Sequence, residues 1–284
     1  MRRPSRESIR LLAGMLAVAT AMALLSGCST APPPKLSVAL FQNRTDYAPR
    51  LLEVEITNHG SGDVVITAAT FVSPYFAGTG RAGHLPYTLV AGTTTDFSAQ
   101  VPAAVCDAPN AKPSVSVTGR DAHGTEFRQT LTPTVPFDSL QTLHAQDCGQ
   151  QAFERVATIV PAPHLRFEQR NGKEIALLDL VIAPTGASGS VRLLSTTGTT
   201  LLIPVEGELR MLDLIFTASS PPTTLTLDYV PSRCGTHFIS EDKIGTLIPF
   251  HAQAGSFADA YFRVAVSPEV KSEFYDWIGR VCGQ

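Results

Sequence analysis

The 284-residue chain has a single tryptophan, and charged residues make up only 17% of it. It contains no run of basic residues, and its formal net charge is −3, which argues against binding to nucleic acid. Beyond residue 27, long stretches of Ala, Glu, Lys and Leu are also absent. Thr, Ser, Pro, Gly and Val are abundant instead, and this composition favours many short strands joined by turns over a helical protein.

The sequence motifs of common active sites are missing as well. No Gly-x-Ser-x-Gly sequence occurs, so the nucleophile of an α/β-hydrolase is not indicated. We expect no histidine to form an i, i+2 or i, i+4 pair with another histidine or with a cysteine, and therefore neither a metal site nor a cofactor. The seven histidines are His59, His84, His123, His144, His164, His237 and His251. We therefore expect no catalytic residues and no enzymatic activity.

One glycine-rich segment matches the dinucleotide-binding pattern G-x-G-x-x-G. It is Gly78-Thr79-Gly80-Arg81-Ala82-Gly83, and Pro86 follows three residues later. The pattern binds a pyrophosphate only between a strand and the N-terminus of a helix. No helical periodicity follows here, so we expect a flexible loop.

The N-terminus has the parts of a secretory signal. An almost uncharged apolar segment, 11–25, follows four basic residues, which are Arg2, Arg3, Arg6 and Arg10. This segment is shorter than the roughly 20 apolar residues that a membrane-spanning helix needs. It ends in Leu25-Ser26-Gly27-Cys28.

These last four residues resemble the lipobox of bacterial lipoproteins. The resemblance implies that 1–27 is a signal peptide, that cleavage precedes Cys28, and that Cys28 carries a diacylglyceryl group. The protein would then be exported and anchored by its lipid to the outer face of the bacterial cell membrane. The alternative is a secretory signal in which Cys28 has no role.

The residues after the cleavage site begin with a proline-rich stalk, 28–35. Three consecutive prolines favour an extended polyproline II conformation. The signal peptide contains four of the 22 basic residues and one of the 25 acidic residues. The remaining chain would therefore have a formal charge near −6, which does not favour adsorption to anionic lipid.

From residue 36 onward the chain shows the alternation of half-buried strands. Leu52, Val54 and Ile56 alternate with polar residues, and a segment rich in turn-forming residues follows at 58–62. The same pattern returns 126 residues later. Five blocks recur in the same order with shifts between 126 and 135 residues: 41–44 with 167–170, 51–56 with 177–182, 101–106 with 229–234, 127–133 with 262–268, and 140–150 with 274–284.

This recurrence predicts a tandem duplication of a whole domain. The first copy is expected at 36–150 and the second at 161–284, with a linker at 151–160. Phe153, Val156 and Ile159 make this linker too apolar for a free tether, so we expect it to pack between the domains.

The duplication also assigns the cysteines. If Cys28 is lipidated, four cysteines remain: Cys106, Cys148, Cys234 and Cys282. Because an exported chain lies in an oxidising compartment, we expect them to form two disulfides. Four cysteines allow three pairings. A disulfide within each copy, 106–148 and 234–282, is the simplest, and each would stabilise its domain by roughly 4 kcal/mol.

Each copy is expected to end in a short helix. In the second copy, Ser267 is a plausible N-cap before Pro268, and Trp277 lies on the apolar face of the helix. We expect Trp277 to be a core residue; the alternative is a ligand-stacking side chain. In the first copy, Phe137, Leu140 and Leu143 predict a shorter helix after Pro136.

Arg128 and Arg263 occupy corresponding positions in otherwise apolar strands. One interpretation is a solvent-facing charge that discourages edge-to-edge strand pairing. The others are a contact to a binding partner, or buried ion pairs with Glu53 and Asp179.

The architecture resembles the tandem immunoglobulin-like repeats of bacterial surface lipoproteins. The expected fold is mainly β: two immunoglobulin-like β-sandwich domains, each closed by a short C-terminal helix and one disulfide. The expected function is a membrane-anchored, non-catalytic binding or spacer module with a protein or cell-wall partner. The alternative is a solute-binding or hydrolytic lipoprotein with a site in the cleft between the repeats.

Overall fold

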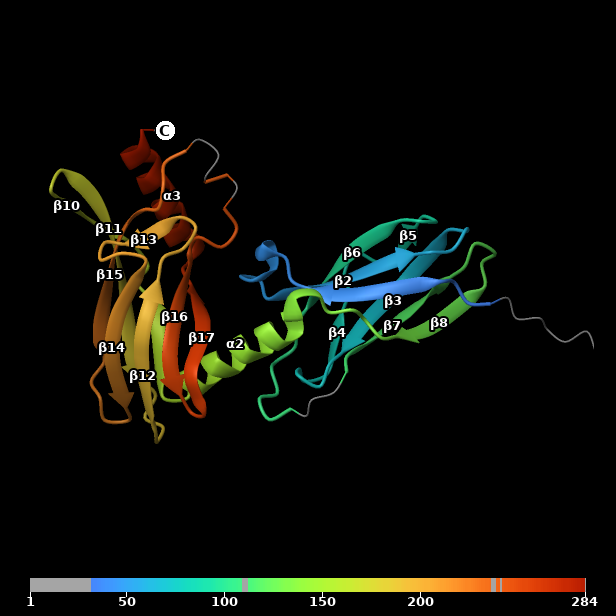
Figure 1. Ribbon diagram of the computed structural model, residues 1–284, viewed down its shortest axis with the longest axis horizontal. Helices are drawn as coiled ribbons and strands as arrows, with labels where there is room; N and C mark the ends of the chain where they lie inside the picture. Colours follow the sequence, from blue (N-terminus) through green and yellow to red (C-terminus); the bar gives the residue numbers. More distant parts are fainter. Residues whose placement is uncertain (1–31, 109–111, 236–238, 241, 284) are drawn as a thin grey trace, which may run out of the picture. The chain divides into compact units, whose positions relative to one another are not determined.

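The computed structural model describes residues 32–108, 112–235, 239–240 and 242–283 (Figure 1). The predicted signal peptide, 1–27, and Cys28 lie outside the described residues, so the lipobox remains a prediction. The chain divides by contacts into units 1–34 and 35–284, and the description below concerns the second unit. In the part of the chain that is described, no helix is long and apolar enough to cross a membrane.

The fold is mainly β, and its sheets are antiparallel. Residues up to 131 form one sheet of order β1-β2-β6 and another of order β4-β3-β7-β8, with β5 also paired to β3. The strands are β1 (Leu36–Phe41), β2 (Leu51–Asn58), β3 (Val64–Val72), β4 (Thr79–Arg81), β5 (Tyr87–Leu89), β6 (Thr94–Gln100), β7 (Ser114–Arg120) and β8 (Glu126–Leu131). A short 3-10 helix, η1 (Arg44–Asp46), lies between β1 and β2.

The later residues form two more sheets. Their orders are β10-β11-β15-β13, with β9 also paired to β11, and β14-β12-β16-β17. The strands are β9 (Ala157–Pro161), β10 (Arg166–Arg170), β11 (Lys173–Pro184), β12 (Ser190–Thr197), β13 (Leu202–Pro204), β14 (Leu209–Thr217), β15 (Thr223–Pro231), β16 (Leu247–Ala254) and β17 (Phe257–Ala265). The helices are η2 (Pro136–Asp138), α2 (Ser139–Glu154) and α3 (Pro268–Cys282).

Two separate clusters of buried apolar side chains form the core. The first collects residues from Val38 to Leu143, and the second collects residues from Ala152 to Ile278. Alternation along the strands supplies these side chains, as in β2, where Leu52, Val54 and Ile56 are fully buried.

The strand order repeats between the two halves. β3 pairs with β7 and β7 with β8, just as β12 pairs with β16 and β16 with β17. The register of β3 shifts between Ile66 and Ala68, and that of β12 shifts between Leu193 and Ser195. Both halves therefore have a β-bulge at the same place in this pairing order.

The strand registers correct two blocks of the sequence repeat: 41–44 with 167–170, and 127–133 with 262–268, since Arg128 on β8 corresponds to Tyr261 and not to Arg263. Leu40 in β1 lies opposite Val54, and Pro161 in β9 lies opposite Leu180, the residue equivalent to Val54. β9 therefore takes the place of β1, and the match of 41–44 with 167–170 in β10 is wrong. The segment 151–160, expected to be a linker, consists of the last turn of α2, a short turn and most of β9.

The structure contains the disulfide pairing that the repeat predicts. Cys106 is joined to Cys148 and Cys234 to Cys282, with a Cα–Cα distance of 5.4 Å in each case. Cys148 lies in α2 and Cys282 ends α3, so each bridge holds a helix to the loop after a strand.

Helix α3 begins as predicted. The Ser267 side chain accepts a hydrogen bond from the Val270 amide at 3.2 Å, with Pro268 in the first turn. Trp277 is fully buried in the second cluster, and its Nε1 donates to the Glu174 carbonyl oxygen. The prediction of a core residue is confirmed.

The first-copy helix differs from its prediction. α2 has 16 residues and is not shorter than α3, which has 15. Phe137 is not part of its apolar face, because its φ is 58° and 93% of its surface is exposed.

The segment 78–83 was expected to be a flexible loop, and this expectation is wrong. The segment contains β4, which pairs with β3. A Cβ atom on Gly80 would lie 1.9 Å from the ring of Phe71. The glycine is therefore required by the packing of β3 against β4, which is unrelated to phosphate binding.

Candidate functional site

Helix α2 contributes to both hydrophobic clusters. Leu140 and Leu143 near its start belong to the first cluster, whereas Ala152 and Phe153 in its last turn belong to the second. Between them, Gly149 packs directly on β17, because a Cβ atom there would lie 2.8 Å from the Cβ of Ala260. α2 is thus a structural part of both halves.

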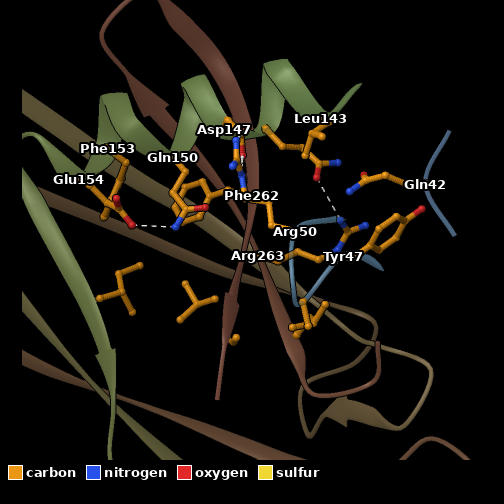
Figure 2. A pocket seen from close by; sticks show the side chains of 16 residues that line it. Gln42, Tyr47, Arg50, Leu143, Asp147, Gln150, Phe153, Glu154, Phe262 and Arg263 are labelled. Atoms are coloured by element: carbon orange, nitrogen blue, oxygen red, sulfur yellow. Dashed lines mark hydrogen bonds and ion pairs between the residues drawn. The ribbon is translucent and has the colours of Figure 1, made fainter. Parts of the chain in front are cut away.

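A pocket of about 270 Å³ lies beside this helix (Figure 2). One face of α2 lines it at helical spacing, with the residues Leu143, Gln146, Asp147, Gln150, Phe153 and Glu154. The β1–β2 connection contributes Gln42, Tyr47 and Arg50, and β17 contributes Phe262 and Arg263. Residues from both halves therefore line one cavity.

Arg50 has a structural role at this pocket. Its φ is 57°, and its guanidinium donates two hydrogen bonds to the Asp147 carboxylate. It also donates to the carbonyl oxygens of Val101 at 2.7 Å and Pro102 at 3.0 Å. Because these contacts occupy its charged group, Arg50 ties the β1–β2 connection and the end of β6 to α2 and is not free for a ligand.

Arg263 has a different environment. It is half-buried, and its Nη1 donates to Gln146 Oε1 at 3.2 Å. The guanidinium carbon lies 4.9 Å from the ring centroids of both Tyr47 and Tyr261, which is a cation–π arrangement. Among the described residues, no carboxylate forms a salt bridge with it.

The structure separates Arg263 from Arg128, the other arginine predicted as a partner contact. Arg128 is exposed on β8, the edge strand of its sheet, as an edge-protecting charge would be. It faces Thr118, and counting from the shared bulge makes Arg128 equivalent to Tyr261, two residues before Arg263.

The hypothesis of buried ion pairs with Glu53 and Asp179 is wrong. Glu53 accepts a hydrogen bond from Ser98 Oγ at 2.7 Å. Asp179 is held by Arg166, at 2.7 and 2.8 Å, and by Thr226.

A second pocket, of about 440 Å³, continues the first. The two share Gln42, Tyr47 and Gln146, and the second adds Asn43, Arg44, Phe137, Ser139 and Thr142. We call the two together the α2 groove. Its second part has no acidic lining residue, and within the described chain Arg44 forms no salt bridge.

A buried acid positions the loop that carries Arg44 and Tyr47. The Asp46 carboxylate accepts a hydrogen bond from the Asn43 amide at 2.6 Å and one from Thr45 Oγ1. Asp46 is only 4% exposed. Burial, followed by the neighbouring charge of Asp46, raises the pKa of Glu53 and of Asp96 above their ordinary values. These carboxylates lie on β2 and β6, outside the groove.

The described residues contain no group of three or more His, Cys, Asp or Glu that could hold a metal. The expectation that no histidine lies four residues from a cysteine is wrong for one pair. His144 precedes Cys148 by four residues, and its Nε2 lies 3.5 Å from the Cys148 sulfur. Cys148 is in a disulfide, however, and His144 stacks on Tyr75 and contacts the Val105 carbonyl oxygen. His237 lies outside the described residues.

No protein-family model and no curated protein sequence matches the chain. Among solved structures, the chain is similar to a chaperone–tip adhesion subunit pre-assembly complex, CsuC–CsuE, from archaic chaperone-usher Csu pili of Acinetobacter baumannii. The TM-score is 0.20 at 11% identity, over 76% of this chain and 91% of that chain. It is also similar to the YadV chaperone, with a TM-score of 0.23 at 11% identity, over 76% and 92%. With such low TM-scores, neither likeness is an argument about this chain.

Proposed function

We propose that this chain is an exported bacterial lipoprotein without catalytic activity, anchored through Cys28 to the outer face of the cell membrane. Its two immunoglobulin-like β-sandwich domains, at 36–150 and 161–284, bind a protein or cell-wall partner or hold it at a distance from the membrane. No cofactor and no nucleic acid take part.

The observation that carries this proposal is the position of α2 in both cores. A helix that buries side chains in two hydrophobic clusters couples them mechanically, since moving it would expose apolar surface in both. Arg50 provides a second connection, because its ion pair with Asp147 joins the β1–β2 connection to the same helix. Such coupling suits a protein that transmits or resists force between its anchor and a partner.

The second candidate function is solute binding or hydrolysis in the α2 groove, which residues of both halves line. A thermal-shift screen against metabolites, metals and cell-wall fragments separates the two functions. A large rise in melting temperature with a small solute favours the second function.

The anchor is tested by replacing Cys28. Cys28→Ala should abolish labelling by radioactive palmitate and release the protein from the membrane fraction, because no other residue would carry the lipid. Ser29→Ala, which leaves the modified cysteine in place, should keep both properties. Labelling of the Cys28 variant at the level of the unmodified protein would show that the lipobox assignment is wrong.

A further inference from the structure

We propose that the α2 groove binds an extended acidic peptide segment of a partner protein. This deepens the binding role proposed above and rests on it. The groove offers two arginines for carboxylates, Arg44 and Arg263, and one aromatic anchor, Phe137.

Charge is the first argument for an acidic ligand. The lining of the groove contains three arginines, of which only Arg50 is neutralised, by Asp147. The other acidic lining residue is Glu154, and it accepts a hydrogen bond from Gln150 at 2.7 Å. Three arginines against two carboxylates leave one positive charge of the lining uncompensated, and in the described part of the chain neither Arg44 nor Arg263 forms a salt bridge.

Phe137 is the second argument. It is exposed by 93%, in a left-handed backbone conformation that a bulky side chain rarely adopts, and the next residue, Asp138, has a φ of 49°. Packing in the fold does not explain an aromatic ring placed in this way. Aromatic and arginine side chains are the residues that most often dominate the energy of a protein–protein contact, and Phe137 lines the same pocket as Arg44.

The remaining lining favours a peptide over a compact solute. Gln42, Asn43, Thr142 and Gln146 provide amide and hydroxyl groups along the groove, which suit the alternating N–H and C=O groups of an extended chain. Arg263 lines one pocket of the groove and Phe137 the other, and the pockets adjoin at Gln42, Tyr47 and Gln146, an arrangement that suits an extended ligand.

A random heptapeptide phage library, panned against the full chain in detergent, tests the proposal. The selected peptides should be enriched in Asp and Glu over the input library, and one should bind by fluorescence anisotropy with an affinity that falls as salt is added. Arg44→Gln and Arg263→Gln should each weaken binding by about tenfold, because a charge-assisted hydrogen bond contributes about 1.5–3 kcal/mol.

The matched control is Arg128→Gln, which removes an exposed arginine on β8 and should leave binding unchanged. Phe137→Ser should weaken binding without lowering the melting temperature, because its ring is exposed; this keeps the test valid if Arg263→Gln loosens the fold. Selected peptides without acidic enrichment, or equal binding by the unmodified protein and all three groove variants, would overturn the proposal. Selective retention on an acidic glycan in place of peptides would also overturn it. The outcome is independent of Cys28, so a failed anchor leaves the groove result intact.

Discussion

Glu53 and Asp179 occupy equivalent positions in β2 and β11, yet their surroundings have diverged. Burial and the nearby Asp46 and Asp96 carboxylates raise the pKa of Glu53, against a smaller opposite effect of the Ser98 hydrogen bond. The Arg166 guanidinium lowers the pKa of Asp179, with a further contribution from Thr226. The two equivalent positions of the sequence repeat thus both hold an acid, but its pKa is shifted in opposite directions.

This difference predicts opposite pH dependence for two matched variants. The raised pKa of Glu53 makes its contribution to stability largest below its ordinary value of 4.5, and this contribution is lost as the pH rises through the folded-state pKa. Glu53→Gln should therefore gain in melting temperature relative to the unmodified protein as the pH rises from about 4 to 7.

For Asp179→Asn the sign is reversed. The lowered pKa of Asp179 stabilises the fold above its ordinary value of 3.8 and is lost as the pH falls. This variant should therefore fall in melting temperature relative to the unmodified protein as the pH rises from about 2 to 5, the range around and below that ordinary value. Parallel curves for the two variants would contradict the assignment.

Residue patterns predicted some of the local structure and not the rest. Ser267, Pro268 and Trp277 were predictable because capping and helical periodicity are local. The exposure of Phe137 was not, since its spacing to Leu140 and Leu143 matches a helical face and only the backbone turn at Phe137 and Asp138 removes it. The groove was hidden for a similar reason: Arg44 and Tyr47 in the β1–β2 connection are far from Arg263 in sequence, and these residues come together only through the long-range packing of α2 and β17.

At the scale of elements, α2 and α3 each contain a glycine with a different reason to be there. Gly149 in α2 is in contact with Ala260 of β17, whereas no atom lies within 4 Å of a Cβ built on Gly279 in α3. There is therefore space for a larger side chain at position 279, whereas there is none at position 149.

Gly279→Ala should stabilise the protein by about 0.5–1 kcal/mol, the usual gain of Ala over Gly in a helix. Gly149→Ala should destabilise it by about 1 kcal/mol, because overpacking costs about 1–3 kcal/mol and exceeds that gain. Urea unfolding of both variants measures the difference. Equal stabilisation by both would show that α2 does not pack closely on β17.

At the scale of the whole molecule, the predicted duplication rests on strand alternation, cysteines and helix positions that recur in order along the sequence. Its boundary was less visible. α2 runs past residue 150, Phe153 and Val156 are buried in the second cluster, and β9 pairs with β11. No turn-rich segment marks the predicted boundary, because the last turn of α2 is buried in the second cluster.

The boundary can be tested with two fragments that differ only at the N-terminus. Residues 151–284 keep Phe153, Val156 and β9, whereas residues 161–284 lose them and expose the edge of β11. Loss of the buried Phe153 ring alone should cost about 3–5 kcal/mol, a large share of a typical domain stability of about 5–15 kcal/mol. Both fragments retain Cys234, Cys282 and Trp277, so urea unfolding can be followed by tryptophan fluorescence under oxidising conditions. The longer fragment should unfold cooperatively, and the shorter one should unfold at a much lower urea concentration or without a transition. Equal midpoints would show that 151–160 is a linker after all. If neither fragment folds until residues 36–150 are added, the two halves form one interlocked domain.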